Sequence, residues 1–321
     1  MRGILRRAVC KIHFFRGLAG LGWHFPPKKN PGKFERHARP AARSPNFAAL
    51  KNKPMGVVRD RLERWGVLPV LRFFYQLPGT LRGLWLWHFR PRKTFVLLLS
   101  AMRSGSTLLK ALLAEAPDIE QIPEVEFQVR GNRFYVYQRF YRLSPLPIVV
   151  LKHPANYSDF RTYPRLPRGE FKIIRLVRNP LDTLLSLRGM NPHLEVEKSD
   201  EELMDYWATT QENLARLQHP RMATVRYEDL IEQPKAVTAR LFAFIGSQQR
   251  EGVDHYHKPR NYEWQWRKDD GGEVIKSLRV QKVEKDYTPH RPLAEKLWAE
   301  PRIRRMVEHF QLKMPVQIPQ P

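Results

Sequence analysis

Short apolar runs alternate with segments of helical periodicity from residue 94 onward. The runs are Thr94–Ser100, Pro147–Lys152 and Phe171–Val177, and a shorter one follows at Ala223–Arg226. The first three are rich in aliphatic and β-branched residues and have the length of strands that are buried on both faces. The pattern therefore predicts strands of a parallel sheet.

The segments between these runs favour helices, and Pro or Gly marks several of their ends. The predicted helices are Thr107–Ala116, Pro180–Arg188, Glu201–Leu217, Gln233–Ile245 and Leu293–Phe310. Nearly apolar strands that alternate with helices indicate an α/β fold with three layers, α/β/α, and helices on both faces of a central parallel sheet. We place this domain at residues 94–312, followed by a Pro-rich tail at 313–321.

The region before residue 94 differs from the rest in charge. Residues 1–93 hold 21 Lys and Arg against three acidic residues, or 21 − 3 = +18, whereas the whole chain of 321 residues carries +24. Residues 26–59 have the composition of a linker, and we expect one or two short helices over 60–93. A basic arm of this kind favours anionic partners or is simply solvated. Nucleic acid is disfavoured because no binding motif accompanies the charge.

No membrane span is predicted. The longest apolar segment, Val67–Phe89, contains Arg72, Arg82 and two prolines. The start of the chain lacks the apolar core of a signal peptide, and Cys10, as the single cysteine, can form no disulfide within the chain. We therefore expect a cytoplasmic protein, with peripheral attachment to a membrane as an alternative.

Aromatic residues and arginines gather near the end of the basic region. They are Trp85, Trp87, Phe89, Arg82, Arg90 and Arg92. The combination predicts either contact with an anionic membrane surface or packing on the domain that follows.

The most informative motif follows the first strand. Residues 103–107 read Arg-Ser-Gly-Ser-Thr and lead into a helix, whose N-terminal N–H groups and dipole form a phosphate cradle. Compared with the triphosphate loop G-x-x-x-x-G-K-[ST], Gly105 and Thr107 fit, but Ser106 replaces the lysine and Ser100 the first glycine. The loop is therefore predicted to hold a diphosphate-like group. A kinase or other nucleotide-dependent phosphotransferase, our alternative, is disfavoured.

A second motif follows the third strand. Arg178 comes at the carboxyl end of that strand, where open parallel sheets bind ligands. Ser186 lies eight residues later, about two helical turns. An arginine and a hydroxyl suit a second, separate phosphate, although each residue alone also fits a structural role.

Together, Arg-Ser-Gly-Ser-Thr-Leu-Leu and Arg-Asn-Pro-x-Asp-x-x-x-Ser resemble the sulfotransferase family, whose donor is 3′-phosphoadenosine 5′-phosphosulfate. The resemblance continues through the Tyr-Glu-Asp-Leu segment at residues 227–230 and covers roughly residues 94–246. It implies that the first loop holds the 5′-phosphosulfate and that the second motif holds the 3′-phosphate. The residues expected to bind this donor are Arg103, Ser104, Gly105, Ser106, Thr107, Leu108, Arg178, Ser186, Tyr227 and Ser277.

Sulfuryl transfer to a hydroxyl needs a base, cations for the leaving phosphate and in-line placement. Arg103 and Lys152 are expected to supply the cations. For the base, Glu124 resembles the catalytic glutamate of the tyrosylprotein and Golgi branches. His153 resembles the histidine of the cytosolic branch, where one residue separates it from the lysine. We favour Glu124, with Glu126 as its main competitor, and therefore the first of these branches.

The acceptor stays open: a hydroxyl of a glycan, tyrosine, lipid or small metabolite is compatible with this donor site. Segments 127–146 and 247–275 are expected to form loops that differ with the acceptor. No metal is predicted, because the histidines lack ligand spacing. A non-catalytic protein that binds polyanions or membranes is a further alternative, disfavoured because Glu124, Lys152, Arg178 and Ser186 are all present.

Overall fold

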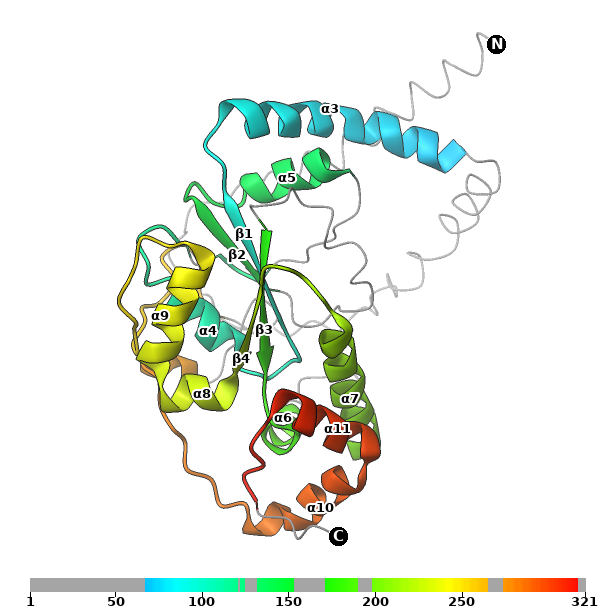
Figure 1. Ribbon diagram of the computed structural model, residues 1–321, viewed down its shortest axis with the longest axis vertical. Helices are drawn as coiled ribbons and strands as arrows, with labels where there is room; N and C mark the ends of the chain where they lie inside the picture. The colour runs from blue at the N-terminus through cyan, green and yellow to red at the C-terminus, as the bar shows by residue number, and fades with distance from the viewer. Residues whose placement is uncertain are drawn as a thin grey trace, which may run out of the picture. The chain divides into compact units, whose positions relative to one another are not determined.

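A computed structural model describes residues 67–120, 122–124, 132–152, 171–189, 198–264 and 274–316. The predicted linker at 26–59 lies outside these residues. The helices and strands are α3 (Val67–Phe89), β1 (Thr94–Ser100), α4 (Ser106–Leu113), α5 (Arg133–Tyr141), β2 (Ile148–Lys152), β3 (Phe171–Val177), α6 (Pro180–Arg188), α7 (Asp200–Arg216), β4 (Met222–Arg226), α8 (Tyr227–Glu232), α9 (Pro234–Ile245), the 3₁₀ helices η3 (Val274–Ser277) and η4 (Thr288–His290), α10 (Arg291–Ala299) and α11 (Pro301–Phe310) (Figure 1).

Within the described residues, four strands form one parallel sheet in the order β2-β1-β3-β4. In β1, Phe95 pairs with Val149 on one side and with Phe171 on the other. Successive side chains of a strand point to opposite faces, so Phe95 joins one buried cluster and Val96 joins the other. Both faces of the sheet are therefore covered, and the predicted α/β fold with a central parallel sheet is confirmed.

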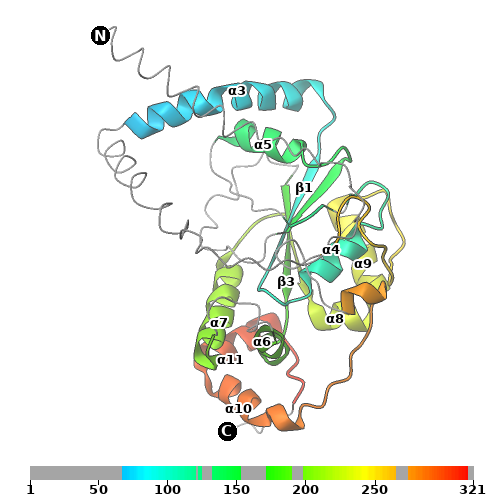
Figure 2. The ribbon, with the colours of Figure 1, turned by 180° about the vertical axis from the view of Figure 1, so that it is seen from behind.

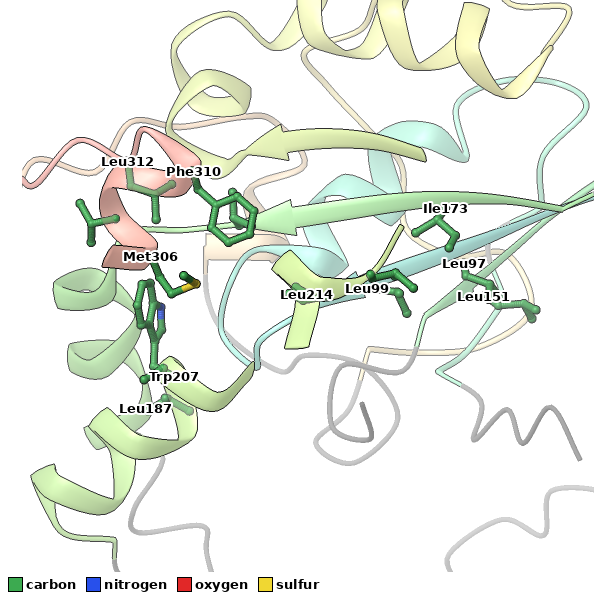
Figure 3. Close-up of a cluster of buried hydrophobic side chains, with 14 of the residues drawn as sticks. Leu97, Leu99, Leu151, Ile173, Leu187, Trp207, Leu214, Met306, Phe310 and Leu312 are labelled. Atoms are coloured by element: carbon green, nitrogen blue, oxygen red, sulfur yellow. The ribbon is translucent and has the colours of Figure 1, made fainter. Parts of the chain in front are cut away.

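Helices of the C-terminal half cover one face. Trp207 of α7 is fully buried and lies in the same cluster as Met306 and Phe310 of α11 and as Leu99 of β1 (Figure 3). Loss of this contact between helices and sheet would destabilise the fold, since deletion of a buried indole costs about 3–5 kcal/mol of folding free energy. These contacts fix the helices around the carboxyl ends of the strands, where the cleft described below opens.

Three helical predictions need correction. One or two short helices were expected over 60–93, but the apolar part of this segment forms the single long helix α3. The pattern over Leu293–Phe310 is not one helix but two, because Pro301 has no N–H to donate and begins the second one, α11. The segment 127–146, expected as a loop, contains α5. The side chain of Asn132 caps α5 by accepting hydrogen bonds from the N–H groups of Phe134 and Tyr135.

The apolar segment before β1 forms one helix of 23 residues, α3, which continues through Pro78. It packs closely on α5, and a Cβ added at Gly83 would lie 1.9 Å from the carbonyl oxygen of Phe134. Trp87 meets Tyr137 of α5 edge-on, with 5.3 Å between ring centroids. Both views show α3 running along α5 (Figures 1 and 2). No helix in the described ranges is long and apolar enough to cross a membrane.

Candidate functional site

A cleft of about 1460 Å³ opens at the carboxyl ends of the strands. Its volume exceeds that of a pocket for one drug-sized ligand, about 300–1,000 Å³, and so has room for two reactants. The wall is built from the loop after β1, the end of β2, the starts of α6 and α8, and the C-terminal segment 274–290. The residues of the two sequence motifs on this wall are Arg103, Gly105, Ser106, Thr107, Leu108, Arg178, Asn179, Asp182 and Ser186.

The loop after β1 turns sharply before α4. Gly105 has a φ of +87°, a left-handed conformation that glycine adopts without steric cost, and Arg103 has a φ of +62°. No side chain caps the N-terminus of α4, so the N–H groups of its first turn remain open on the cleft side. An uncapped helix N-terminus in a cleft binds anions through these N–H groups and the helix dipole.

The second motif contacts the first directly. The Nε of Arg103 donates a hydrogen bond of 2.9 Å to Oγ of Ser186, and Arg178 donates one of 2.8 Å to the carbonyl oxygen of Arg103. The guanidinium of Arg178 also lies over the ring of Tyr227, 4.2 Å from its centroid. A Cβ on Gly105 would lie 2.4 Å from the same ring. Residues far apart in the sequence thus form one side of the cleft.

Burial shifts the pKa of two groups beside Arg178, the ring hydroxyl of Tyr227 and the carboxyl of Glu228. Burial raises the pKa of Tyr227, although the charge of Arg178 opposes this shift. Burial also raises the pKa of Glu228, outweighing its hydrogen bonds from Asn179 and the charge of Arg178.

Asp182 joins α6 to the C-terminal segment, a contact that the sequence did not predict. Lys285 and the hydroxyl of Tyr287 both donate to Oδ1 of Asp182, the latter over 3.0 Å. Burial would raise the pKa of Asp182, but the charge of Arg178 and the hydrogen bonds from Asn179 and Lys285 outweigh it, and the pKa falls below its ordinary value. Burial and this carboxylate raise the pKa of Tyr287 to about 12. In the sequence, only the position of Asp182 in the motif Arg-Asn-Pro-x-Asp pointed to this contact.

On the other side of the loop, Lys152 joins the phosphate cradle to the predicted base. Its side chain is 2% exposed, and Nζ donates a hydrogen bond of 2.7 Å to Oγ1 of Thr107. The same ammonium lies 3.1 Å from Oε2 of Glu124. The structure therefore brings Glu124, Lys152 and Thr107, three residues that the sequence analysis placed in the site, together at the cleft wall.

A buried lysine of α4 supports the backbone next to Glu124. Lys110 is 1% exposed, and its Nζ donates a hydrogen bond of 2.7 Å to the carbonyl oxygen of Ile122. The hydroxyl of Tyr262 reaches the same oxygen over 3.1 Å. Sequence reasoning missed Lys110, because a lysine in the first turns of a helix ordinarily indicates a solvent-exposed position.

Other predicted residues lie elsewhere. Ser104 is fully buried and is not on the cleft wall. Ser277 closes a local turn instead, with Oγ 2.8 Å from the carbonyl oxygen of Val274. His153 and Glu126 lie outside the described residues. Within the described ranges, no group of three or more His, Cys, Asp or Glu side chains could hold a metal ion.

The fold is thus a parallel sheet with a strand-loop-helix at a cleft, the arrangement with which α/β proteins commonly bind phosphorylated ligands. The family model of the sulfotransferase domain matches residues 93–265, more than half of the chain. The chain belongs to the sulfotransferase family, and sulfuryl transfer is its reaction class. The branch within the family stays a prediction. Among curated proteins, none matches the sequence.

Solved structures of sulfotransferases resemble the chain at low identity. The sulfotransferase domain of the curacin biosynthetic pathway is 19% identical over 70% of this chain and 99% of its own, with a TM-score of 0.43. The sulfotransferase domain of the Synechococcus PCC 7002 olefin synthase is 20% identical over 71% and 98%, with a TM-score of 0.45. A sulfotransferase from Alicyclobacillus acidocaldarius is 15% identical over 70% and 97%, with a TM-score of 0.41. Membership of the family depends on the family model, not on these structures.

Proposed function

We propose that the protein transfers a sulfuryl group from 3′-phosphoadenosine 5′-phosphosulfate to a hydroxyl acceptor. The observation that carries the proposal is the position of Lys152. Its ammonium lies between Thr107 of the phosphate cradle and the carboxylate of Glu124. A cation for a leaving phosphate and a base for an acceptor proton thus meet at one point of the cleft, where the transferred group would pass between donor and acceptor.

Each of these residues has a separate role in the transfer. The acceptor oxygen forms a bond to sulfur while the bond from sulfur to the 5′-phosphate oxygen breaks, and the phosphate leaves with the electron pair. Glu124 takes the proton of the acceptor hydroxyl. Lys152 and the N-terminus of α4 stabilise the charge that grows on the leaving phosphate, as preorganised cations and dipoles do in other transfer reactions. Arg103 contributes a second cation beside them.

The 3′-phosphate is assigned to Arg178 and Ser186. Arg178 is held in place by the carbonyl of Arg103 and by the ring of Tyr227. Ser186 is hydrogen-bonded to Arg103, which links the two phosphate sites through one side chain. A donor with two phosphates would therefore order both motifs at once, and a nucleotide with a single phosphate would order only one.

The role of Glu124 is tested with Glu124→Gln, which keeps the shape of the side chain and removes its basicity. Turnover should fall by about 10²–10⁴-fold, the usual contribution of a general base. Binding of 3′-phosphoadenosine 5′-phosphate, measured by calorimetry, should survive. Glu232→Gln is the matched control, because Glu232 is another cleft carboxylate and contacts Lys313 instead. Retained turnover in Glu124→Gln would move the role of base to His153.

The second-phosphate site is tested with Arg178→Ala. This variant should weaken 3′-phosphoadenosine 5′-phosphate far more than adenosine 5′-phosphate, by about 1.5–3 kcal/mol for a lost charge-assisted hydrogen bond. Arg188→Ala at the far end of α6, the helix that follows Arg178, is the control, since Arg188 pairs with Asp200 outside the cleft. Equal losses for both nucleotides would refute the assignment. Labelled donor and a panel of glycan, peptide and lipid extracts would then identify the acceptor class.

A further inference from the structure

Exposed hydrophobic side chains are concentrated on one helix. Of the eleven large hydrophobic residues that are exposed in the described part of the chain, eight lie on α3, so the concentration is a property of this helix and not of the whole surface. Seven of the eight form what we call the apolar face: Val70, Phe73, Phe74, Leu81, Leu84, Trp85 and Phe89. They recur at the spacing of a single helical stripe, whereas the opposite face carries Gly79 and Gly83 against α5.

The side chains of the apolar face are large and partly aromatic. Phe74 is 63% exposed, Phe89 is 72% exposed and Trp85 is 48% exposed. Trp85 and Phe89 lie with 6.3 Å between ring centroids, and the guanidinium of Arg90 lies 5.4 Å from the ring of Trp85. Of the three aromatic residues that the sequence analysis singled out, Trp87 is turned inward onto Tyr137 and is not part of this face. A row of large exposed apolar side chains on one helix indicates an interaction site.

The helix of the apolar face and its neighbour α5 are positively charged. Neither α3 nor α5 contains an acidic residue, and the sequence has none between Glu63 and Glu115. Six arginines on or next to these two helices are exposed: Arg82, Arg90, Arg92, Arg133, Arg139 and Arg142. The partner must therefore offer both an apolar interior and negative charge around it. An anionic phospholipid bilayer offers this combination, with acyl chains for the rings and headgroups for the guanidinium groups.

Other occupants fit this charge less well. A second copy of the chain would bring the same arginines against these arginines, and like charges at close range repel. Residues 1–58 of the chain itself hold 13 Lys and Arg against Glu35, or 13 − 1 = +12, so they add positive charge rather than compensate it. We propose that α3 docks the protein on an anionic membrane surface through its apolar face, without crossing the bilayer.

This docking would leave the cleft free. The helix ends at Phe89, just before β1 begins at Thr94, and therefore lies at the amino end of that strand. The cleft lies at the carboxyl end, past Ser100, and seven residues of strand span roughly 20 Å. An acceptor and a donor could thus enter from the side away from the membrane.

The proposal is tested with the full chain and two kinds of vesicle, phosphatidylcholine alone and phosphatidylcholine with phosphatidylserine in equal parts. The chain should cosediment with the anionic vesicles. Phe74→Ser/Trp85→Ser should weaken this binding by about tenfold or more, since each side chain is partly buried in lipid. Arg82→Ala/Arg90→Ala should weaken it on the order of tenfold, an effect that added salt reduces. Val274→Ser, which removes an apolar side chain that is 53% exposed outside α3, should bind vesicles like the parent.

Fluorescence identifies the inserted residue. Brominated phosphatidylcholine in the anionic vesicles should quench tryptophan emission, and Trp85→Phe should lose much of this quenching while it keeps vesicle binding. Unchanged binding of Phe74→Ser/Trp85→Ser would overturn the proposal and assign the affinity to the basic N-terminal residues. A parent chain that ignores anionic vesicles would also overturn it. The proposal would also be overturned if the chain formed a dimer in solution and Phe74→Ser/Trp85→Ser dissociated it, because the apolar face would then be an interface between copies.

Discussion

The close approach of Gly105 to Tyr227 gives a quantitative test of how the two motifs are joined. Replacing Gly105 by Ala adds a Cβ that would lie 2.4 Å from two ring carbons of Tyr227. The same change forces a residue with a Cβ into a φ of +87°. The ring has little freedom to withdraw, because Arg178 lies over it, 4.2 Å from its centroid.

The free-energy costs of the strained backbone and of the crowded ring can be estimated separately. The left-handed conformation costs a residue with a Cβ about 1–2 kcal/mol, and overpacking against a fixed ring costs about 1–3 kcal/mol. Gly105→Ala should therefore lower the free energy of unfolding by about 2–5 kcal/mol and weaken 3′-phosphoadenosine 5′-phosphate. Removal of the ring in Tyr227→Ala should relieve the second penalty and leave the first.

The assay is a double-mutant cycle of Gly105→Ala and Tyr227→Ala, with unfolding followed in urea. The double variant should be about 1–3 kcal/mol more stable than the sum of the single effects predicts. Gly189→Ala is the control, since its Cβ would meet ordinary contacts at 3.6 Å and its φ is −61°. Strictly additive effects would refute the reasoning, because they would mean that the ring does not limit the loop.

Two further predictions concern residues that line or support the cleft. Lys110→Met should lower kcat without changing the affinity for 3′-phosphoadenosine 5′-phosphate, since Lys110 supports the backbone next to Glu124; an equal loss in the affinity would indicate a general loss of structure instead. Asp182→Asn should be less stable than the parent at neutral pH. Because the pKa of Asp182 is lowered by folding, its stabilisation is present above the pKa of the unfolded chain and is lost as pH falls through the lowered pKa. Urea unfolding across that acidic range should show the two chains converge, and a constant difference would contradict the assignment.

The strands were predictable because their signal is local. Thr94–Ser100 and Phe171–Val177 are short runs of mostly apolar residues, and the structure has strands with these bounds. The break at Pro301 and the helix α5 were missed for different reasons. Pro301 lies in the middle of a periodic pattern that both helices share, and α5 buries its residues against α3, a contact that no periodicity reveals.

The site residues that lie in the two sequence motifs were predictable. Arg103 and Arg178 were found because each follows a strand whose end was clear. Lys110 and Lys285 were not found, because their importance arises from tertiary contacts, of Lys110 to the carbonyl oxygen of Ile122 and of Lys285 to Asp182. Nothing in the neighbouring sequence distinguishes such lysines from solvated ones.

The structure explains why the loop needs no lysine at position 106. A triphosphate loop carries its cation on its own helix, whereas here the cation comes from the neighbouring strand. Lys152 pairs in register with Leu98 of β1, so it ends the adjacent strand just before the loop and reaches Thr107 from the side. In that position the ammonium also contacts Glu124. Because the cation is on β2 and not in the loop, it lies between the phosphate cradle and the carboxylate of Glu124. This arrangement suits the transfer of a group from a phosphate to a hydroxyl that is losing its proton.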